Sequence, residues 1–367
     1  MADHLKTRYR ITAHDQAEAE ALAERISLEQ SAELPKGALE KLPHTVPVGK
    51  IRGIHPDDAG YFILEMDWPA ALFGQDRLQL LNVLFGNISL LPGIRLEFVE
   101  WSSAAGLFPG PAQGISGIRQ QLNIYDRPLS CAALKPIGLT ADELADRVRQ
   151  FARGGFDIIK DDHGLADQPS APFSERFEKC SLAAAEAEQL RGRPVIYAPN
   201  VTASPETLPK RLELCRKAGL RMVMISPHLT GPDSLSLPGR YGLGVMAHPA
   251  FSGTMVLKRN SGLAPHVLYG EVWRALGADG VIYPNAGGRF VLSPDDCKAI
   301  NQSARNPDLP WNPSWPVPGG GMQRDTIHEW TARYGKDTIF LIGGSLYEAP
   351  EGIEQASAKF TEALHQT

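Results

Sequence analysis

A dense set of ionisable residues follows a short apolar run near the middle of the chain. The run Phe156-Asp157-Ile158-Ile159 leads directly into Lys160, Asp161, Asp162 and His163. This arrangement is suited to acid–base catalysis, because a lysine that is partly withdrawn from water has a lowered pKa and can transfer a proton. It is also suited to a divalent-metal site. An amine is a poor ligand for Mg²⁺, but a lysine carbamate would supply an anionic oxygen. A surface cluster of ion pairs at a strand end is the non-functional alternative.

The elements that must position these residues alternate regularly from residue 129 onward. Eight apolar runs are expected to be strands: Leu129–Leu134, Phe156–Ile159, Pro194–Pro199, Arg221–Ser226, Gly242–Ala247, Gly280–Pro284, Trp315–Pro318 and Thr338–Ile342. Seven helical patterns follow them: Ala141–Arg153, Glu175–Leu190, Pro205–Ala218, His266–Leu276, Asp295–Gln302, Met322–Tyr334 and Pro350–His365. This alternation predicts right-handed βαβ units and a (β/α)8 barrel. A doubly wound open sheet is the alternative, but no GxGxxG motif follows the first strand.

The first part of the chain has a different pattern. Helices are expected at His14–Glu29 and Asp76–Phe85, and strands at Gly60–Met66 and Gly93–Val99. This mixture is typical of an α+β domain. The fold class predicted for the whole chain is therefore α/β, with a smaller α+β domain over 1–125 and a C-terminal (β/α)8 TIM barrel over 126–367.

Polar groups or glycines follow every predicted strand of the barrel, at the end where such barrels carry their active sites. Those singled out are Lys135, Lys160, Asn200, Ser226, His248, Asn285, Gly319–Gly321 and Gly343–Ser345. The glycine loops after the seventh and eighth strands each open a helix, so their backbone N–H groups are predicted to bind phosphate. Tight turns without a ligand are the alternative interpretation.

The composition narrows the classes of function. The formal net charge is −5 and no run rich in Lys and Arg occurs, so neither nucleic acid nor an anionic membrane surface is an expected partner. No apolar run reaches the roughly 18–20 residues of a membrane span. The four cysteines are far apart and form no CxxC pair, which favours a cytoplasmic protein with reduced thiols.

Several segments resemble the large subunit of ribulose bisphosphate carboxylase/oxygenase (RuBisCO). They are KPIGLT, GGFDIIKDDHGLADQPSAPFSERF, FGNISLLPGIRLEFVE and GISGIRQQLNIYDRPLSCAALKP, together with the His248 strand and the two glycine loops. The resemblance covers nearly the whole chain. It implies an N-terminal α+β domain, a barrel, and a homodimer whose active sites are shared between subunits.

The resemblance also implies roles for individual residues. Lys135 corresponds to the general base that enolises the substrate, and Lys160 to the lysine that CO2 carbamylates. Asp162 corresponds to a ligand of Mg²⁺, and His163 stands where the family has a metal-binding glutamate. His248 corresponds to the barrel histidine near the hydroxyl groups of the sugar.

Further residues are implied in substrate binding. Glu29 and Asn87 correspond to the pair that reaches into the active site of the second subunit. The residues expected to bind phosphate or substrate in the barrel are Gly320, Gly321, Gly343, Gly344 and Asn200.

Departures from the family pattern argue against CO2 fixation. Pro249 replaces an arginine that grips a phosphate, and Ile282-Tyr283-Pro284 lacks the expected histidine. The loop PNAGGRF lacks the lysine that stabilises the carboxylated intermediate. The chain therefore resembles the RuBisCO-like proteins, and the resemblance implies that it enolises another phosphorylated sugar.

The function expected from this pattern is isomerisation of a phosphorylated ketose through an enediolate, with 5-methylthioribulose 1-phosphate of methionine salvage as the substrate. Because His163 replaces a glutamate, three outcomes are open: Mg²⁺ is kept with a nitrogen ligand, another metal is preferred, or the metal is lost and His163 acts in acid–base chemistry beside a free Lys160 amine. Retained Mg²⁺ is expected, since Lys160 and Asp162 are both present. One alternative is a 2,3-diketo-5-methylthiopentyl-1-phosphate enolase, which should keep the full metal triad. Others are a decarboxylase of a branched 3-oxo sugar-acid phosphate, as in apiose catabolism, and a non-catalytic relative that binds sugar phosphates.

Overall fold

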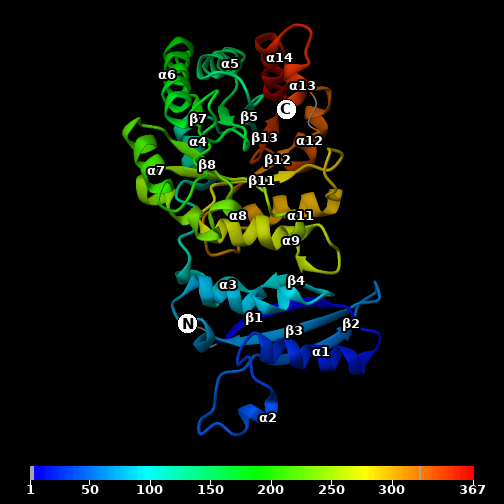
Figure 1. Ribbon diagram of the computed structural model, residues 1–367. Helices are drawn as coiled ribbons and strands as arrows, with labels where there is room; N and C mark the ends of the chain where they lie inside the picture. Colours follow the sequence, from blue (N-terminus) through cyan, green and yellow to red (C-terminus); the bar gives the residue numbers. More distant parts are fainter. Residues whose placement is uncertain (1–3, 322–323) are drawn as a thin grey trace. The chain divides into compact units, whose positions relative to one another are not determined.

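The computed structural model describes residues 4–321 and 324–367, which form two compact units (Figure 1). The N-terminal unit contains the chain up to Pro109 together with Ser252–Leu268 and Asp308–Pro310. The barrel unit contains Gly110–Phe251, Tyr269–Pro307 and Trp311–Thr367. The first unit therefore takes up two short segments that the sequence places within the barrel region.

The N-terminal unit is a five-stranded sheet of order β10-β4-β1-β3-β2, in which only β10 pairs parallel to its neighbour. Its strands are β1 (His4–Ile11), β2 (Lys50–Pro56), β3 (Phe62–Pro69), β4 (Ile94–Val99) and β10 (Gly262–Leu263). Its helices are α1 (Gln16–Glu29), α2 (Lys36–Leu39), α3 (Arg77–Phe85) and α9 (Gly253–Val256). The two helices and two strands expected here are present, and β1 and β2 are additional.

One face of this sheet is buried. Alternate residues of β1, including Leu5, Tyr9 and Ile11, have no exposed surface, as the two-residue period of a strand requires. The Tyr9 hydroxyl donates to the carbonyl of Leu84 in α3 at 2.7 Å. Helix α3 therefore covers the buried face of the sheet.

The barrel unit contains eight parallel strands in the order β7-β6-β5-β13-β12-β11-β9-β8. They are β5 (Leu129–Leu134), β6 (Ile158–Asp161), β7 (Ile196–Ala198), β8 (Met222–Ile225), β9 (Gly244–Ala247), β11 (Gly280–Pro284), β12 (Trp315–Gly319) and β13 (Ile339–Ile342). Met224 N–H donates to Pro199 at 2.9 Å and Val201 N–H donates to Met224 at 3.0 Å, which links the first strand of this order to the last. The predicted barrel and its eight strands are confirmed.

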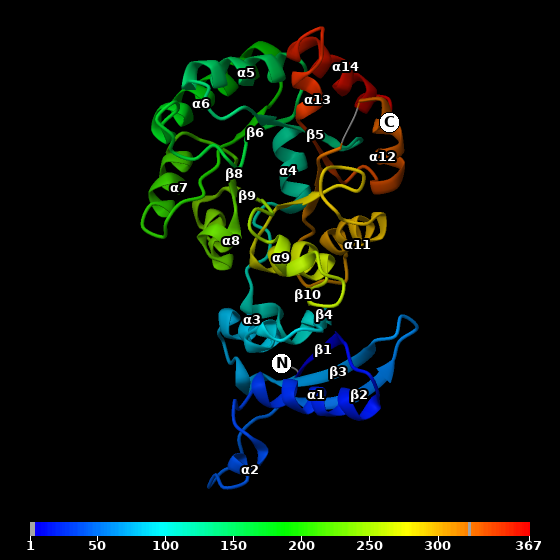
Figure 2. The same ribbon diagram turned by 45° about the vertical axis from the view of Figure 1, so that its right-hand side comes forward.

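Helices surround the strands of the barrel (Figures 1 and 2). They are α4 (Gly114–Leu122), α5 (Ala141–Arg153), α6 (Phe173–Arg191), α7 (Leu208–Lys217), α8 (Pro227–Thr230), α10 (Trp273–Leu276), α11 (Pro294–Arg305), α12 (Ile327–Tyr334), α13 (Gly344–Tyr347) and α14 (Ile353–His365). The helix expected over His266–Leu276 is a π-helix at His266–Val272 followed by α10. Of the helix expected from Met322, the first two residues lie outside the described residues.

Helix α4 fills the amino end of the barrel (Figure 2). Its Ile118 and Leu122 pack in one buried cluster with the first residues of several strands, among them Leu129, Ile158 and Ile339. Apolar burial of this kind is the dominant stabilising contribution to a fold. Because the core is concentrated there, the carboxyl ends of the strands are left for polar side chains.

Candidate functional site

Lys160 lies inside the barrel at the end of β6. Ile158, two residues earlier, belongs to the barrel core, so the strand period directs Lys160 to the same side. Its side chain is almost fully buried, and Nζ donates to the carbonyl of Asp161 at 3.0 Å. Burial lowers the pKa of Lys160, which increases the fraction of neutral amine.

The side chain of Asp161 points away from the barrel interior, and its hydrogen bonds hold the end of β6 in place. Its carboxylate accepts hydrogen bonds from Arg176 Nε at 3.1 Å, Tyr197 OH at 2.8 Å and the Asn200 backbone N–H at 3.0 Å. Both Asp161 and Arg176 are fully buried. A buried carboxylate with this many partners positions its neighbours, Lys160 and Asp162, and has no oxygen free for a substrate.

Asp162 lies between two cationic or hydrogen-bonding groups. Its carboxylate is 3.2 Å from Lys135 Nζ and 3.1 Å from His163 Nδ1. Burial alone would raise the pKa of Asp162, but the hydrogen bond with His163 and the charges of Lys160 and Lys135 outweigh it and lower the pKa well below its usual range. Asp162 is therefore an anion that holds Lys135 and His163 in place.

The two histidines of the predicted site stack on each other. The rings of His163 and His248 lie 4.4 Å apart and nearly parallel. The backbone N–H of Ala250 donates to His248 Nδ1 at 3.1 Å, so the proton of the neutral ring lies on Nε2. Burial, together with the charge of Lys160, lowers the pKa of His248 well below its ordinary value. His248 is thus a neutral donor through Nε2.

Lys135 is fixed by a tyrosine that sequence reasoning missed. Its backbone N–H donates to Tyr347 OH at 2.8 Å, and Tyr347 OH donates to the Ala133 carbonyl at 2.8 Å. Tyr347 ends α13, the short helix that follows the second glycine loop. No motif marks Tyr347 in the sequence, because its role depends on β5 and β13 being neighbours in the barrel.

The glycine loop after β13 approaches Lys135, and both glycine loops border open space. A Cβ added to Gly343 would lie 3.8 Å from Lys135 Cε, whereas one added to Gly344 or Gly320 would meet nothing within 4 Å. Gly320 and Gly321 both have positive φ, and Gly321 packs closely on Gly288. The loop after β12 therefore requires glycine for its backbone, and its phosphate-binding role stays a prediction.

Asn200 is engaged inside the protein. Its side-chain amide donates to the carbonyls of His163 and Leu165, each at 3.0 Å, and its oxygen accepts from Thr202 N–H at 3.1 Å. The residue is almost fully buried. In this structure Asn200 holds the loop that carries Asp162 and His163, and its predicted contact with substrate is untested.

Glu29 and Asn87 lie together in the N-terminal unit. Asn87 Nδ2 donates to Glu29 Oε1 at 3.0 Å, although the two residues are far apart in the chain. Glu29 ends α1, and Asn87 follows α3 by two residues. The pairing predicted from sequence is therefore present on one surface, while its role in a second subunit's site stays a prediction.

Tyr283, near the end of β11, does not replace the missing histidine or lysine. Ile282 belongs to the barrel core, so the strand period directs Tyr283 to the outer side, where it is fully buried. Burial raises the pKa of Tyr283 well above its ordinary value. Tyr283 is therefore a packing residue rather than an acid–base group of the site.

The unmodified side chains do not fit Mg²⁺. No three His, Cys, Asp or Glu residues within 4–321 and 324–367 are placed to hold a metal ion. Lys160 presents an amine, and the single carboxylate beside it, Asp162, already contacts Lys135 and His163. Mg²⁺ prefers oxygen ligands. The prediction of Mg²⁺ therefore depends on the carbamate of Lys160.

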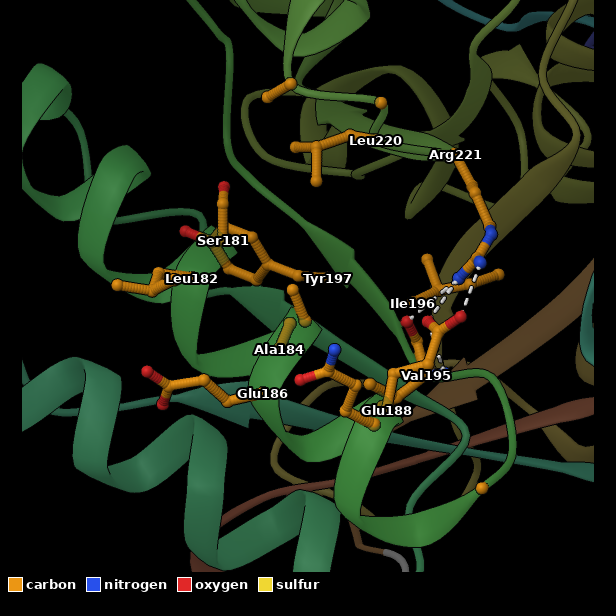
Figure 3. Close-up of a pocket in the computed structure, with 15 residues that line it drawn as sticks. Ser181, Leu182, Ala184, Glu186, Glu188, Val195, Ile196, Tyr197, Leu220 and Arg221 are labelled. Carbon is orange, nitrogen blue, oxygen red and sulfur yellow. Dashed lines mark hydrogen bonds and ion pairs between the residues drawn. The ribbon is translucent and has the colours of Figure 1, made fainter.

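A surface groove on the outside of the barrel is a separate feature (Figure 3). It has a volume of about 490 Å³ and is lined from α6 and from the segments that enter β7 and β8. Arg221 and Glu188 form an ion pair at 2.8 Å within it. None of the predicted site residues lines this groove.

Among the described helices, none is long and apolar enough to cross a membrane.

Comparison with known proteins identifies the class of protein that this fold and site define. Residues 114–366 match the family described as the ribulose bisphosphate carboxylase large chain, catalytic domain. The ribulose bisphosphate carboxylase-like protein 1 of Rhodopseudomonas palustris is 38% identical over 98% of this chain and 97% of that protein. The chain belongs to the RuBisCO large-chain family, as one of its RuBisCO-like members.

Two further relatives have names that specify reactions. The 5-methylthioribulose-1-phosphate isomerase of Rhodospirillum rubrum is 36% identical over 99% of this chain and 97% of that protein. A 2,3-diketo-5-methylthiopentyl-1-phosphate enolase of Microcystis aeruginosa is 32% identical over 86% of this chain and 81% of that protein. Both names describe enolisation or isomerisation of a phosphorylated compound.

Solved structures agree with this assignment. The RuBisCO-like protein from Rhodopseudomonas palustris has a TM-score of 0.89 at 33% identity and covers 100% of this chain and 99% of that one. The dimeric archaeal RuBisCO from Hyperthermus butylicus has a TM-score of 0.85 at 26% identity and covers 99% of this chain and 90% of that one.

Proposed function

We propose that this chain isomerises a phosphorylated ketose through an enediolate, with 5-methylthioribulose 1-phosphate as its substrate. The observation that carries the proposal is the convergence of Lys135, Asp162, His163 and His248 from three different strand ends. Lys135 Nζ is 3.2 Å from Asp162, Asp162 is 3.1 Å from His163, and His163 stacks on His248 at 4.4 Å. A positioned base and an oriented proton donor are what a proton transfer next to a ketone requires.

In the proposed reaction Lys135 Nζ takes the proton from the carbon beside the ketone. The electron pair of that C–H bond becomes the C=C bond, and the former carbonyl oxygen takes up negative charge. A carbamate on buried Lys160 would hold Mg²⁺, which would supply positive charge for this oxygen. His248 Nε2–H gives its proton to the former carbonyl carbon, and the same nitrogen takes the proton of the neighbouring hydroxyl group, whose oxygen becomes the new carbonyl. The former carbonyl oxygen takes a proton from solvent, and Lys135 gives its proton to solvent. The net result is an isomer of the substrate, with no carbon–carbon bond changed.

Asp162 and the glycine loops complete the proposed site. Asp162 holds Lys135 close to the substrate carbon and is kept ionised by its neighbours. Gly320 and Gly344 border open space, and their loops follow β12 and β13, the usual phosphate position in (β/α)8 barrels. The phosphate would therefore bind beside Lys135, which Gly343 approaches closely.

The choice of substrate rests on two observations. The relative of 36% identity that spans nearly the whole chain is named as the 5-methylthioribulose-1-phosphate isomerase. Pro249 follows His248 directly, so this strand end provides no cation for a second phosphate. A substrate with one phosphate and an apolar thioether tail suits both observations.

The enolase reaction is the second candidate, because a relative of 32% identity carries that name. An enolase would act on 2,3-diketo-5-methylthiopentyl 1-phosphate and release the enol. Incubating the purified chain with each compound and identifying the product by NMR separates the two. We expect an isomer from 5-methylthioribulose 1-phosphate and no enol from the diketo compound. The opposite result would assign the enolase reaction.

A carbamate on Lys160 and a homodimer belong to the same proposal. The lowered pKa of buried Lys160 supports carbamylation, because only a neutral amine adds to CO2. With that carbamate, Asp162 and His163 would be the other ligands of Mg²⁺. The hydrogen-bonded pair of Glu29 and Asn87 supports a site completed by a second subunit.

A further inference from the structure

Large apolar side chains are exposed around the carboxyl end of the barrel. We name these five residues, all in the barrel unit and all more than half exposed, the apolar rim: Ile137, Leu229, Phe251, Phe290 and Val291. They lie on the loops after β5, β8, β9 and β11, the same edge that carries Lys135 and His248. A group of exposed apolar residues of this kind marks a binding surface more often than an isolated one does.

Phe251 is held in an unfavourable backbone conformation. Its φ is +70°, in the left-handed region that bulky residues rarely adopt, and its side chain is 78% exposed. The turn that carries it also carries the Ala250 N–H that fixes His248. Backbone strain of this kind persists where the surrounding structure imposes it, and it is concentrated at functional sites. The turn thus presents an aromatic ring three residues from an imidazole of the site.

The strand order places part of the rim across the barrel from the glycine loops. Counted around the eight strands, β8 lies four positions from β13, and β9 lies four positions from β5. Leu229 follows β8 and Phe251 follows β9, whereas Gly344 follows β13 and Lys135 follows β5. A substrate whose phosphate lies at Gly320 and Gly344 therefore extends its other end toward Leu229 and Phe251.

We propose that Leu229 and Phe251 bind an apolar substituent at the end of the substrate remote from the phosphate, and that they determine specificity for an alkylthio group over a hydroxyl group. The inference rests on the proposed function and adds the residues that select the tail. Pro249, which stands between His248 and this turn, adds apolar surface and no charge at the same strand end.

The test compares 5-methylthioribulose 1-phosphate with ribulose 1-phosphate, which carries a hydroxyl group in place of the methylthio group. The variants are Phe251→Ala and Leu229→Ser. Leu190→Ser is the matched control, because Leu190 is as exposed as Phe251 but lies at the end of α6, outside the rim. Each variant should lower the ratio of kcat/KM for the two substrates by about tenfold, with little change for ribulose 1-phosphate. The control should keep the ratio of the native chain.

Two results would overturn the inference. One is an unchanged ratio in both rim variants. The other is an equal loss of kcat/KM for both substrates together with a lower molecular mass of the variant by light scattering. That result would make the apolar rim a contact between subunits. If the native chain exchanges no proton of either compound, the proposed function fails separately. Isothermal titration of the same two compounds then decides the inference, which requires the ratio of their Kd values to fall about tenfold in the variants.

Discussion

Lys135, Asp162, His163 and His248 form a set in which each side chain fixes the next. Asp162 contacts Lys135 Nζ at 3.2 Å and His163 Nδ1 at 3.1 Å, and His163 stacks on His248. The Ala250 N–H fixes the tautomer of His248. We therefore propose that Lys135 abstracts the proton and that His248 returns one.

Replacing the proposed base tests this assignment. Lys135→Met should lower the rate of proton exchange by about 10³-fold, because it removes general base catalysis. The side chain is one-third exposed, so the midpoint of thermal unfolding should change little. Lys210→Met, at an exposed position on α7, is the control and should exchange at the native rate. An active Lys135→Met protein would transfer the role to another group.

We expect Mg²⁺ to stimulate the reaction only when CO2 is present. The unmodified side chains do not fit Mg²⁺, so the ion requires the carbamate on Lys160. Because burial lowers the pKa of Lys160, carbamylation should increase as pH rises through that lowered value. Labelled bicarbonate retained by the native chain, and absent from Lys160→Met, measures the modification. Stimulation by Mg²⁺ in CO2-free buffer would contradict this coupling.

At the scale of elements, a buried ion pair holds the end of β6 against α6. Arg176 and Asp161 are both fully buried, and Arg176 Nε lies 3.1 Å from the Asp161 carboxylate. Tyr197 of β7 also donates a hydrogen bond to Asp161. Arg176→Met should lower the free energy of unfolding by about 3–5 kcal/mol, because it leaves Asp161 charged and buried. Urea denaturation measures the effect. Arg176→Met combined with Asp161→Asn should regain part of the loss, and an equal or larger loss would refute the pairing argument.

The turn after β9 makes a second prediction at this scale. Phe251→Gly should be more stable than Phe251→Ala by about 1 kcal/mol, because glycine adopts positive φ without the penalty of a Cβ. Both variants lose the same aromatic ring, so the comparison isolates the backbone. Equal midpoints of urea denaturation would show that this turn relaxes in the absence of the ring.

The sequence predicted the barrel well because its strands are short, mostly apolar and separated by strongly patterned helices such as α5, whose bounds agree residue for residue. It missed β1 and β2, whose exposed residues dilute the apolar signal. The residues that it singled out for the site lie at or just after strand ends, and their roles stay predictions: Lys135, Lys160, Asp162, His163 and His248. It could not find Tyr347 or the outward role of Asp161, because those depend on contacts between elements distant in the chain.

At the scale of the whole molecule, the proposal requires a site assembled from two subunits. Glu29→Ala removes a proposed site residue from the N-terminal unit, and Lys135→Met removes the proposed base from the barrel unit. Each variant alone should therefore be inactive. Mixing them under conditions of subunit exchange should restore about a quarter of the native activity. Half of the dimers would then be hybrids, each with one intact site of two. No recovery, despite hybrids detected by mass spectrometry, would place Glu29 and Lys135 in the same subunit's site.

Proton exchange with solvent is the direct test of the proposed enolisation by Lys135. The native chain is incubated in D2O with 5-methylthioribulose 1-phosphate, with Mg²⁺ and bicarbonate present, and followed by proton NMR. We expect deuterium at the carbon beside the ketone and the formation of an isomer, with both lost in Lys135→Met. Binding of the compound without deuterium uptake by the native chain would contradict it.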